Sequence, residues 1–369
     1  MSDIQEVVAR IAEELVASGA ERGLQVAAYV DQQAVVDVVA GVTDPVSGRP
    51  VEPGTLFYNW SIGKGATATL VHRLVDAGAI GYDTPVAELW PEFARHGKQA
   101  ITVRQVLNHS AGVPGLPAGA TLESVCSWES MTRALEDAEL WWEPGTQVGY
   151  HAYTFGYLAG EIVRRATGRE LGDVLADLTT AIGCPGEIRY GIPAAQVSGL
   201  AALEDAPSDG HWSQGDMPDD VPMFRAAPMA VFPSAAFGND PRVIAADIPA
   251  GAKVTARALA RMYAGWLGEV YGARLVTSER LAEASAESSS GPDQVYGNDS
   301  RWGLGFALGL PWAEAGSPRV FGMAGAGGSW AGADPERGVA VAITKNVLSM
   351  DFETVRRIVG AILAEVDRG

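Results

Sequence analysis

The sequence predicts an α+β protein in which an antiparallel sheet flanked by helices is joined to a mainly helical lobe. Strand patterns lie near the two ends of the chain, and helical patterns fill its middle. The 369 residues also exceed the roughly 250–300 at which a single hydrophobic core stops growing. We therefore expect an α/β lobe made of residues 1–60 and 250–369 and a mainly helical lobe made of residues 61–249.

The N-terminal elements are a helix and a hairpin. Residues 4–17 carry apolar side chains at three-and-four spacing, which is typical of a helix with one buried face. Residues 25–29 and 34–39 are short Val-rich runs separated by a polar turn, which predicts an antiparallel hairpin. We expect the helix and the hairpin to pack together as one layer.

The C-terminal elements complete the same lobe. Residues 339–343 form a continuous apolar run that predicts a buried strand, and residues 351–366 have the apolar stripe of a helix. The middle of the chain predicts helices separated by Gly- and Pro-rich loops, at residues 63–77, 102–108, 123–138, 154–166, 170–181 and 255–267.

Residues 203–249 form the least regular stretch, rich in Asp, Pro, Gly and Met. Loops of this length are usually functional or disordered, and we expect this one to form a wall of the substrate pocket. Its aromatic and sulfur-containing side chains favour hydrophobic acyl or aromatic substrates; they are Trp212, Met217, Met223 and Met229.

The charge balance excludes several classes of partner. The chain has 27 Lys and Arg against 45 Asp and Glu, a net charge of −18, which repels both nucleic acids and anionic lipid surfaces. No apolar run approaches the ~18 residues that a membrane span requires. The acidic start is unlike a secretory signal, so we expect a cytoplasmic protein that acts on a small-molecule ester or acyl substrate. No oligomeric state is indicated.

The two cysteines do not indicate a metal site. Cys126 and Cys184 lie in apolar surroundings and belong to no cluster with metal-ligand spacing. We expect neither a disulfide nor a metal, and no organic cofactor is required.

Ser61 and Lys64 are the candidate nucleophile and base. A serine at the first turn of a helix and a lysine three residues later share one face, which brings the amine towards the hydroxyl. The N–H groups of the helix N-terminus can stabilise an oxyanion, and a partly desolvated lysine loses its proton more easily. The alternative is a helix-capping serine followed by a solvated lysine.

Two further segments are candidates for the site. Tyr150 lies on a turn just before the helix expected from residue 154, where a phenol beside an amine can relay a proton. Its alternative is a packing role. Residues 321–329 contain four glycines, which let the backbone approach a substrate closely, or else form a hairpin turn.

These motifs in this order resemble the S-x-x-K serine hydrolases, which include class C β-lactamases, family VIII carboxylesterases and D-aminopeptidases. Residues 101–114, ITVRQVLNHSAGVP, are similar to the family phrase ITVRQLLSHTSGLP. Residues 302–306, WGLGF, and 333–336, ADPE, also fit the family, and the resemblance covers nearly the whole chain. It implies a β-lactamase/transpeptidase-like fold with the site between the two lobes.

The resemblance assigns roles to individual residues. It implies that Ser61 is acylated, that Lys64 accepts its proton and that Tyr150 shuttles this proton. The oxyanion hole would be formed by the backbone N–H groups of Ser61 and Ala326. From the residues themselves, and not from the resemblance, we expect substrate to contact positions around the second and third motifs, namely His151, Ala152, Met323, Gly325 and Trp330.

Two departures from the family pattern bear on the substrate. Tyr150-His151-Ala152 stands where β-lactamases carry Tyr-x-Asn, and Met323-Ala324-Gly325 replaces Lys-Thr-Gly or His-Thr-Gly. The amide that contacts a lactam side chain and the group that binds a substrate carboxylate are both lost. We therefore expect poor hydrolysis of penicillins and D-peptides.

The remaining histidines have structural alternatives. His109 is expected to be a satisfied structural residue, and His72 is expected to face solvent or core. His151 either lines the mouth of the pocket or packs inside. A Ser-His-Asp triad is disfavoured, because the chain contains no G-x-S-x-G motif.

The sequence therefore predicts a serine carboxylesterase that works through an acyl-enzyme on Ser61. One alternative is a transacylase that transfers the acyl group to an amine or alcohol in small-molecule biosynthesis, which requires that water be kept from the acyl-enzyme. The other is a catalytically silent protein that uses the cleft to bind a ligand. The presence of Ser61, Lys64 and Tyr150 together argues against the silent protein.

Overall fold

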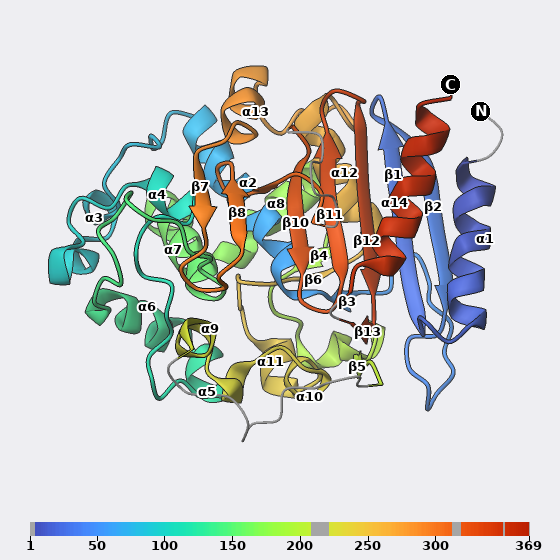
Figure 1. The fold of residues 1–369 in the computed structure, drawn as a ribbon, viewed down its shortest axis with the longest axis horizontal. Helices are drawn as coiled ribbons and strands as arrows, with labels where there is room; N and C mark the ends of the chain where they lie inside the picture. The colour runs from blue at the N-terminus through green and yellow to red at the C-terminus, as the bar shows by residue number, and fades with distance from the viewer. Residues whose placement is uncertain (1–3, 208–220, 312–318, 350, 369) are drawn as a thin grey trace.

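A computed structural model describes residues 4–207, 221–311, 319–349 and 351–368. Its centre is an eight-stranded sheet with the strand order β2-β1-β12-β11-β10-β9-β8-β7 (Figure 1). All its pairings are antiparallel. In that order the strands are β2 (Gln33–Gly41), β1 (Gly23–Val30), β12 (Val339–Lys345), β11 (Ser329–Asp334), β10 (Phe321–Gly325), β9 (Ala307–Leu308), β8 (Asp299–Trp302) and β7 (Ser289–Pro292).

The two ends of the chain meet in this sheet. β1 pairs with β2 on one side and with β12 on the other, so the N-terminal hairpin extends the C-terminal strands. All seven residues of β12 are buried, which explains its uninterrupted apolar pattern. The predicted α+β class is confirmed.

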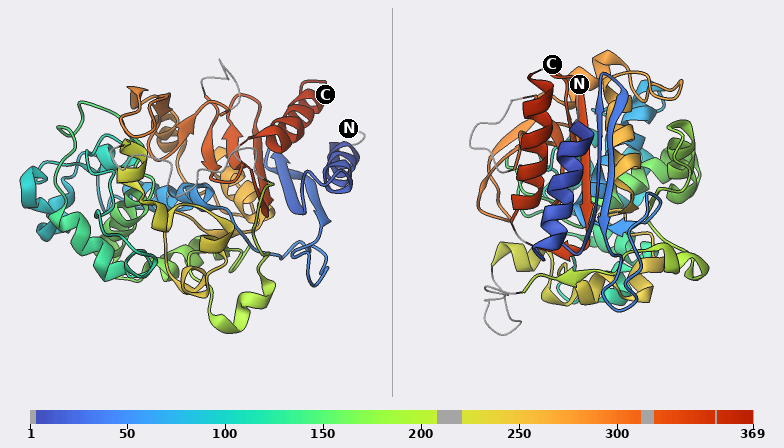
Figure 2. Two further views of the ribbon diagram at one scale, coloured as in Figure 1. Left: turned by 60° about the horizontal axis from the view of Figure 1, so that its bottom comes forward. Right: turned by 90° about the vertical axis from the view of Figure 1, so that its right-hand side faces the viewer.

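Helices cover both faces of the sheet. α1 (Ile4–Ala17) and α14 (Glu353–Val366) pack on one face, and α12 (Ala256–Leu267) packs on the other (Figure 2). Side chains of a strand alternate between these faces: in β12, Val341 packs under the terminal helices and Ala342 packs towards α12.

The rest of the molecule is mainly helical (Figure 1). Ser127 separates two helices where the sequence predicts a single one at 123–138, because its side chain accepts a hydrogen bond from the backbone of Ser130 and caps a new helix. The helices are α2 (Lys64–Asp76), α3 (Val86–Leu89), α4 (Val103–Leu107), α5 (Leu122–Val125), α6 (Trp128–Asp137), α7 (Thr154–Thr167), α8 (Leu171–Ala181) and α13 (Ser278–Ala284), with the 3-10 helices η2 (Pro91–Gly97) and η3 (Ala194–Gly199).

Two small sheets join the parts of the chain. β3 (Phe57–Tyr58) and β4 (Ile188–Arg189) pair with β6 (Lys253–Val254) on its two sides. β5 (Glu204–Asp205) runs parallel to β13 (Val347–Leu348). β3 leads directly into the turn that carries Ser61.

The described part of the irregular segment, residues 203–207 and 221–249, contains short helices. They are α9 (Pro222–Ala226), η4 (Met229–Val231), α10 (Ala235–Gly238) and α11 (Pro241–Ala245). Met223 and Met229 are partly buried on α9 and η4, whereas Trp212 and Met217 lie outside the described residues. Within the described ranges, the helices are too short or too polar to cross a membrane. Cys126 and Cys184 are free thiols.

Candidate active site

Ser61 lies in a tight turn between a strand and a helix. β3 ends at Tyr58, the 3-10 helix η1 spans Trp60–Gly63, and α2 begins at Lys64. Trp60, directly before the serine, has a φ of +41°, a region that side chains other than glycine rarely adopt. Its ring is buried and stacks on Tyr58, with 4.8 Å between ring centres. Packing around the indole therefore holds a strained backbone beside the candidate nucleophile.

Two glycines let a distant segment approach this turn. A Cβ on Gly63 would lie 2.4 Å from the backbone nitrogen of Ala252, and one on Gly251 would lie 2.8 Å from the Cα of Trp60. Both distances are shorter than any real contact of a Cβ atom, so larger residues would separate the two segments. The close approach brings the carbonyl of Ala250 to Lys64.

Lys64 is a buried amine with two partners in the site. Its Nζ atom lies 2.8 Å from Ser61 Oγ and donates a hydrogen bond to the carbonyl oxygen of Ala250, also across 2.8 Å. The residue is only 1% exposed, and burial lowers the pKa of its amine well below the ordinary value. An uncharged amine can accept the proton of Ser61, as the spacing of the two residues predicts.

Tyr150 is the third residue that the structure brings to this point. The centre of its ring lies 5.1 Å from Lys64 Nζ, and its hydroxyl is hydrogen-bonded to Ser61. Burial raises the pKa of the phenol, and the bond to Ser61 partly opposes this shift. The phenol is therefore protonated at neutral pH and can donate its proton.

The rings and loops around Tyr150 fix its position. Trp302 stacks on it almost in parallel, with 5.3 Å between ring centres and 5° between planes. The carboxylate of Asp293 accepts a hydrogen bond from the backbone N–H of Tyr150 and two more from the backbone of Val295 and Tyr296. Tyr296, 41% exposed, lies beside Tyr150 at the surface.

Two buried histidines form hydrogen bonds with the backbone on either side of Tyr150. His151 Nδ1 donates to the carbonyl of Gly149, and its Nε2 accepts from the N–H of Val113. His109 Nδ1 accepts from the N–H of His151. These bonds require both imidazoles to be neutral. Burial lowers the pKa of His151 from 6.5 to about 4, and it lowers the pKa of His109 as well.

The structure thus corrects the substrate-binding role expected for His151. Its side chain is completely buried and holds the backbone, because both of its ring nitrogens have partners inside the protein. His109 is a buried structural residue, but it is not satisfied as expected, because its Nε2 has no hydrogen-bond partner among the described residues. His72 faces the core, where it contacts the hydroxyl of Tyr82 and the carbonyl of Leu304.

The third motif reaches the serine turn along β10. A Cβ on Gly325 would lie 2.3 Å from the backbone oxygen of Asn59, so this glycine allows close contact with the strand-to-helix turn. The partly exposed Ala326 follows at the end of the strand. Met323 is buried in a cluster with Val148 and Tyr150, so it supports the tyrosine. Ala152, after the second motif, is partly exposed.

Trp330 is not part of the site. It lies in β11 and packs in the cluster beneath α1 and α14, whereas its neighbour Ala331 faces the opposite side with α12. Successive strand residues point to opposite faces, and an aromatic side chain close to the glycines in sequence is here directed away from them. The expected contact of Trp330 with substrate is therefore corrected.

Sequence reasoning missed four contributors to the site. They are Ala250, whose carbonyl binds Lys64, and the residues that hold or flank Tyr150, namely Asp293, Tyr296 and Trp302. Trp302 belongs to a segment that resembles the family, which was the one available signal. The others come from segments without a recognisable motif.

A serine that contacts both a buried lysine of lowered pKa and a tyrosine hydroxyl defines a serine hydrolase of the S-x-x-K class. The family model described as Beta-lactamase matches residues 8–364, and the chain belongs to this family. It is 34% identical over 351 residues to Esterase/beta-lactamase LipL of Mycobacterium tuberculosis, across 88% of this chain and 77% of that protein.

Solved structures agree with this assignment. A family VIII carboxylesterase is 29% identical, with a TM-score of 0.88 and 98% of each chain covered. A penicillin-binding protein homologue from Caulobacter crescentus is 33% identical, with a TM-score of 0.84 and 98% of this chain and 96% of that chain covered.

Proposed function

We propose that this protein hydrolyses carboxylic esters through an acyl-enzyme on Ser61. The observation that carries the proposal is the 2.8 Å contact between Ser61 Oγ and a lysine amine whose pKa is lowered by burial. The names of the similar proteins, an esterase/β-lactamase and a family VIII carboxylesterase, favour the same substrate class.

Acylation follows from the positions of the three side chains. Ser61 Oγ attacks the ester carbonyl while its proton passes to the uncharged amine of Lys64. The N–H groups of Ser61 and Ala326 are proposed to stabilise the oxyanion of the tetrahedral intermediate. When the bond between the acyl carbon and the alkoxy oxygen breaks, Tyr150 donates a proton to the departing alcohol and regains one from Lys64.

Deacylation repeats these steps with water. Lys64 and Tyr150 accept a proton from the water as it attacks the acyl carbon, and Ser61 regains its proton when the acid leaves. Each cycle consumes one ester and one water and releases one acid and one alcohol. Ser61, Lys64 and Tyr150 perform the proton transfers of both steps.

We propose acyl transfer as a second activity of the same acyl-enzyme. An amine or an alcohol can take the place of water in the second step, which yields an amide or a new ester from the same acyl-enzyme. Product analysis with and without an added amine separates the two activities, because hydrolysis alone gives only the free acid.

The decisive experiment for the proposed function is intact mass spectrometry after incubation with a p-nitrophenyl ester or a phosphonate. The wild type should gain the mass of one acyl or phosphonyl group, and Ser61→Ala should gain none. Ser47→Ala, at an exposed serine, is the matched control and should be labelled like the wild type. Equal labelling of the wild type and Ser61→Ala would refute the role of Ser61.

A further inference from the structure

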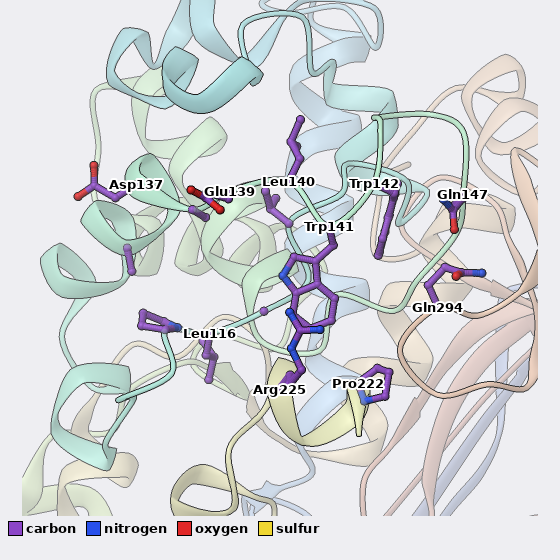
Figure 3. Close-up of a pocket in the computed structure, with 15 residues that line it drawn as sticks. Leu116, Asp137, Glu139, Leu140, Trp141, Trp142, Gln147, Pro222, Arg225 and Gln294 are labelled. Carbon is purple, nitrogen blue, oxygen red and sulfur yellow. The ribbon is translucent and has the colours of Figure 1, made fainter. Parts of the chain in front are cut away.

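A cavity of about 660 Å³ opens in the helical part of the molecule and is lined by none of Ser61, Lys64 and Tyr150. It lies between residues 113–117, the segment that follows α6, and α9 (Figure 3). Its volume falls within the ~300–1,000 Å³ that is usual for small-molecule sites.

The centre of this cavity holds a cation on an aromatic ring. The guanidinium carbon of Arg225 lies 4.4 Å from the ring centre of Trp141, and Figure 3 shows the two side chains side by side. A Cβ on Gly115 would lie 2.6 Å from the indole, so a glycine is needed for the ring to lie against this segment. The distance of 4.4 Å between Arg225 and Trp141 is that of a cation–π contact, which holds the guanidinium against the indole in the lining of the cavity.

Arg225 is the one cationic side chain among the described residues that line the cavity, and Asp137 and Glu139 are the acidic ones. Among the described residues Arg225 forms no ion pair, whereas the carboxylate of Asp137 is already paired with Arg95 across 2.8 Å. In Figure 3, Asp137 and Glu139 lie on one side of Trp141 and the amides of Gln147 and Gln294 on the other. Asp137 and Glu139 repel an anionic ligand bound at Arg225. The uncharged part of that ligand is therefore expected to lie towards Gln147 and Gln294.

On the side of Gln147 and Gln294, the walls of the cavity fit the apolar part of a ligand. Trp142 and Pro222 line the cavity there, and Leu140 adds a further apolar side chain. A chain with a net charge of −18 repels anions in general, so an unpaired arginine in a concave site is the feature that can select one. Arginine binds a carboxylate with two parallel hydrogen bonds.

We propose that this pocket binds a small organic carboxylate with an aromatic body, its carboxylate paired with Arg225 and its rings packed against Trp141 and Trp142. The proposed carboxylate contact uses none of Ser61, Lys64 and Tyr150. The carboxylate can be the acid released by ester hydrolysis or an unrelated metabolite, because both present the same group to Arg225.

Calorimetric titration of the full chain with 2-naphthoate and the uncharged 2-naphthamide tests the proposal. Naphthoate should bind wild type at least about tenfold more tightly than naphthamide, as expected for one charge-assisted contact. Arg225→Gln should remove this preference. Arg133→Gln, an exposed arginine of α6 that pairs with Glu129, is the matched control and should keep it.

Inhibition kinetics distinguish binding of naphthoate at Arg225 from binding at the catalytic cleft. Binding at the catalytic cleft would make it a competitive inhibitor whose inhibition constant is the same in wild type and Arg225→Gln, and this result would overturn the proposal. Equal affinity of wild type and Arg225→Gln for naphthoate, or no heat of binding to wild type at millimolar concentration, would overturn it as well. Circular dichroism verifies that the exposed Arg225→Gln change leaves the fold intact.

Discussion

The side-chain nitrogen of Lys64 donates a hydrogen bond to the carbonyl oxygen of Ala250 across 2.8 Å, although 186 positions separate the two residues. A carbonyl orients the amine towards Ser61 without the full negative charge that would hold it in the ammonium form. A carboxylate at this place would raise the pKa of the lysine and remove the base. The glycines that allow residues 250–252 to approach the turn are therefore needed to orient Lys64.

The pH dependence of turnover should report this lysine. Its pKa is lowered by burial, so the active, uncharged amine is present above that pKa and is lost as the pH falls through it. We expect kcat/KM for a p-nitrophenyl ester to rise with pH along a single acid limb that lies well below pH 10.5 and then to level off. A limb close to the ordinary lysine value would show that Lys64 is not the base.

Loss of either proton carrier should slow acylation strongly. Lys64→Ala and Tyr150→Phe remove a general base or acid, which typically costs about 10²–10⁴-fold. The measurement is the burst of p-nitrophenol in stopped flow, with Tyr271→Phe at an exposed tyrosine as the control. Thermal unfolding verifies that the variants fold. Near-normal bursts from either variant would contradict the proton relay.

The contact between the third motif and the serine turn can be tested with one methyl group. Gly325→Ala places a Cβ 2.3 Å from the oxygen of Asn59, so β10 must move away from η1. We expect kcat to fall about 100-fold, as for a displacement of about 1 Å in a catalytic group. Gly360→Ala, on α14 with open space around it, should leave kcat unchanged. Equal kcat values for both variants would exclude a role for this contact.

The buried histidines should make the fold sensitive to acid. The pKa of His151 is about 4 in the folded protein and 6.5 as a free side chain, so the unfolded state binds more protons between these values. The contribution of His151 to the free energy of unfolding is therefore present above pH 6.5 and is lost as the pH falls towards 4. At pH 5 the loss from this residue is about 2 kcal/mol.

Urea unfolding at pH 7 and pH 5 measures this loss. We expect His151→Gln to show a smaller difference between the two pH values than the wild type. The control is His96→Asn, at an exposed histidine in η2, which should behave like the wild type. A pH difference that is unchanged in His151→Gln would assign the acid sensitivity to other groups.

Lactam hydrolysis should be weak beside ester hydrolysis. Ala152 offers no amide to a lactam side chain, and Met323 is buried against Tyr150, where it offers no charge to a carboxylate. We expect nitrocefin to be hydrolysed with a kcat/KM several orders of magnitude below that for a p-nitrophenyl ester. Ala152→Asn should raise the nitrocefin rate. Comparable rates for both substrates in the wild type would contradict this interpretation.

Local patterns predicted the parts of the site that depend on short sequence distances. Ser61 and Lys64 are three residues apart, so the geometry of one helical turn brings them together. The role of Tyr150 came from the resemblance, and the structure places its hydroxyl on Ser61. The fold class followed from the location of strand and helix patterns along the chain.

The remaining contacts depend on tertiary packing that short patterns do not encode. Ala250 reaches Lys64 only because of the close approach of two segments, and Asp293 reaches the backbone of Tyr150 from a loop 143 residues away. Trp330 was assigned to the site from its place next to the glycines. Successive side chains of β11 point to opposite faces of the sheet, and both faces are covered by helices. The direction of the Trp330 side chain can therefore be predicted only if it is known which face lies towards the catalytic serine.

The pairing of β1 with β12 has a consequence for synthesis on the ribosome. Glu21, just before β1, forms a buried ion pair with Lys345, at the end of β12, across 324 positions of the chain. A nascent chain must therefore expose the inner edge of its first hairpin until almost the last strand has emerged. During translation, this edge is the surface that a chaperone would need to shield from aggregation.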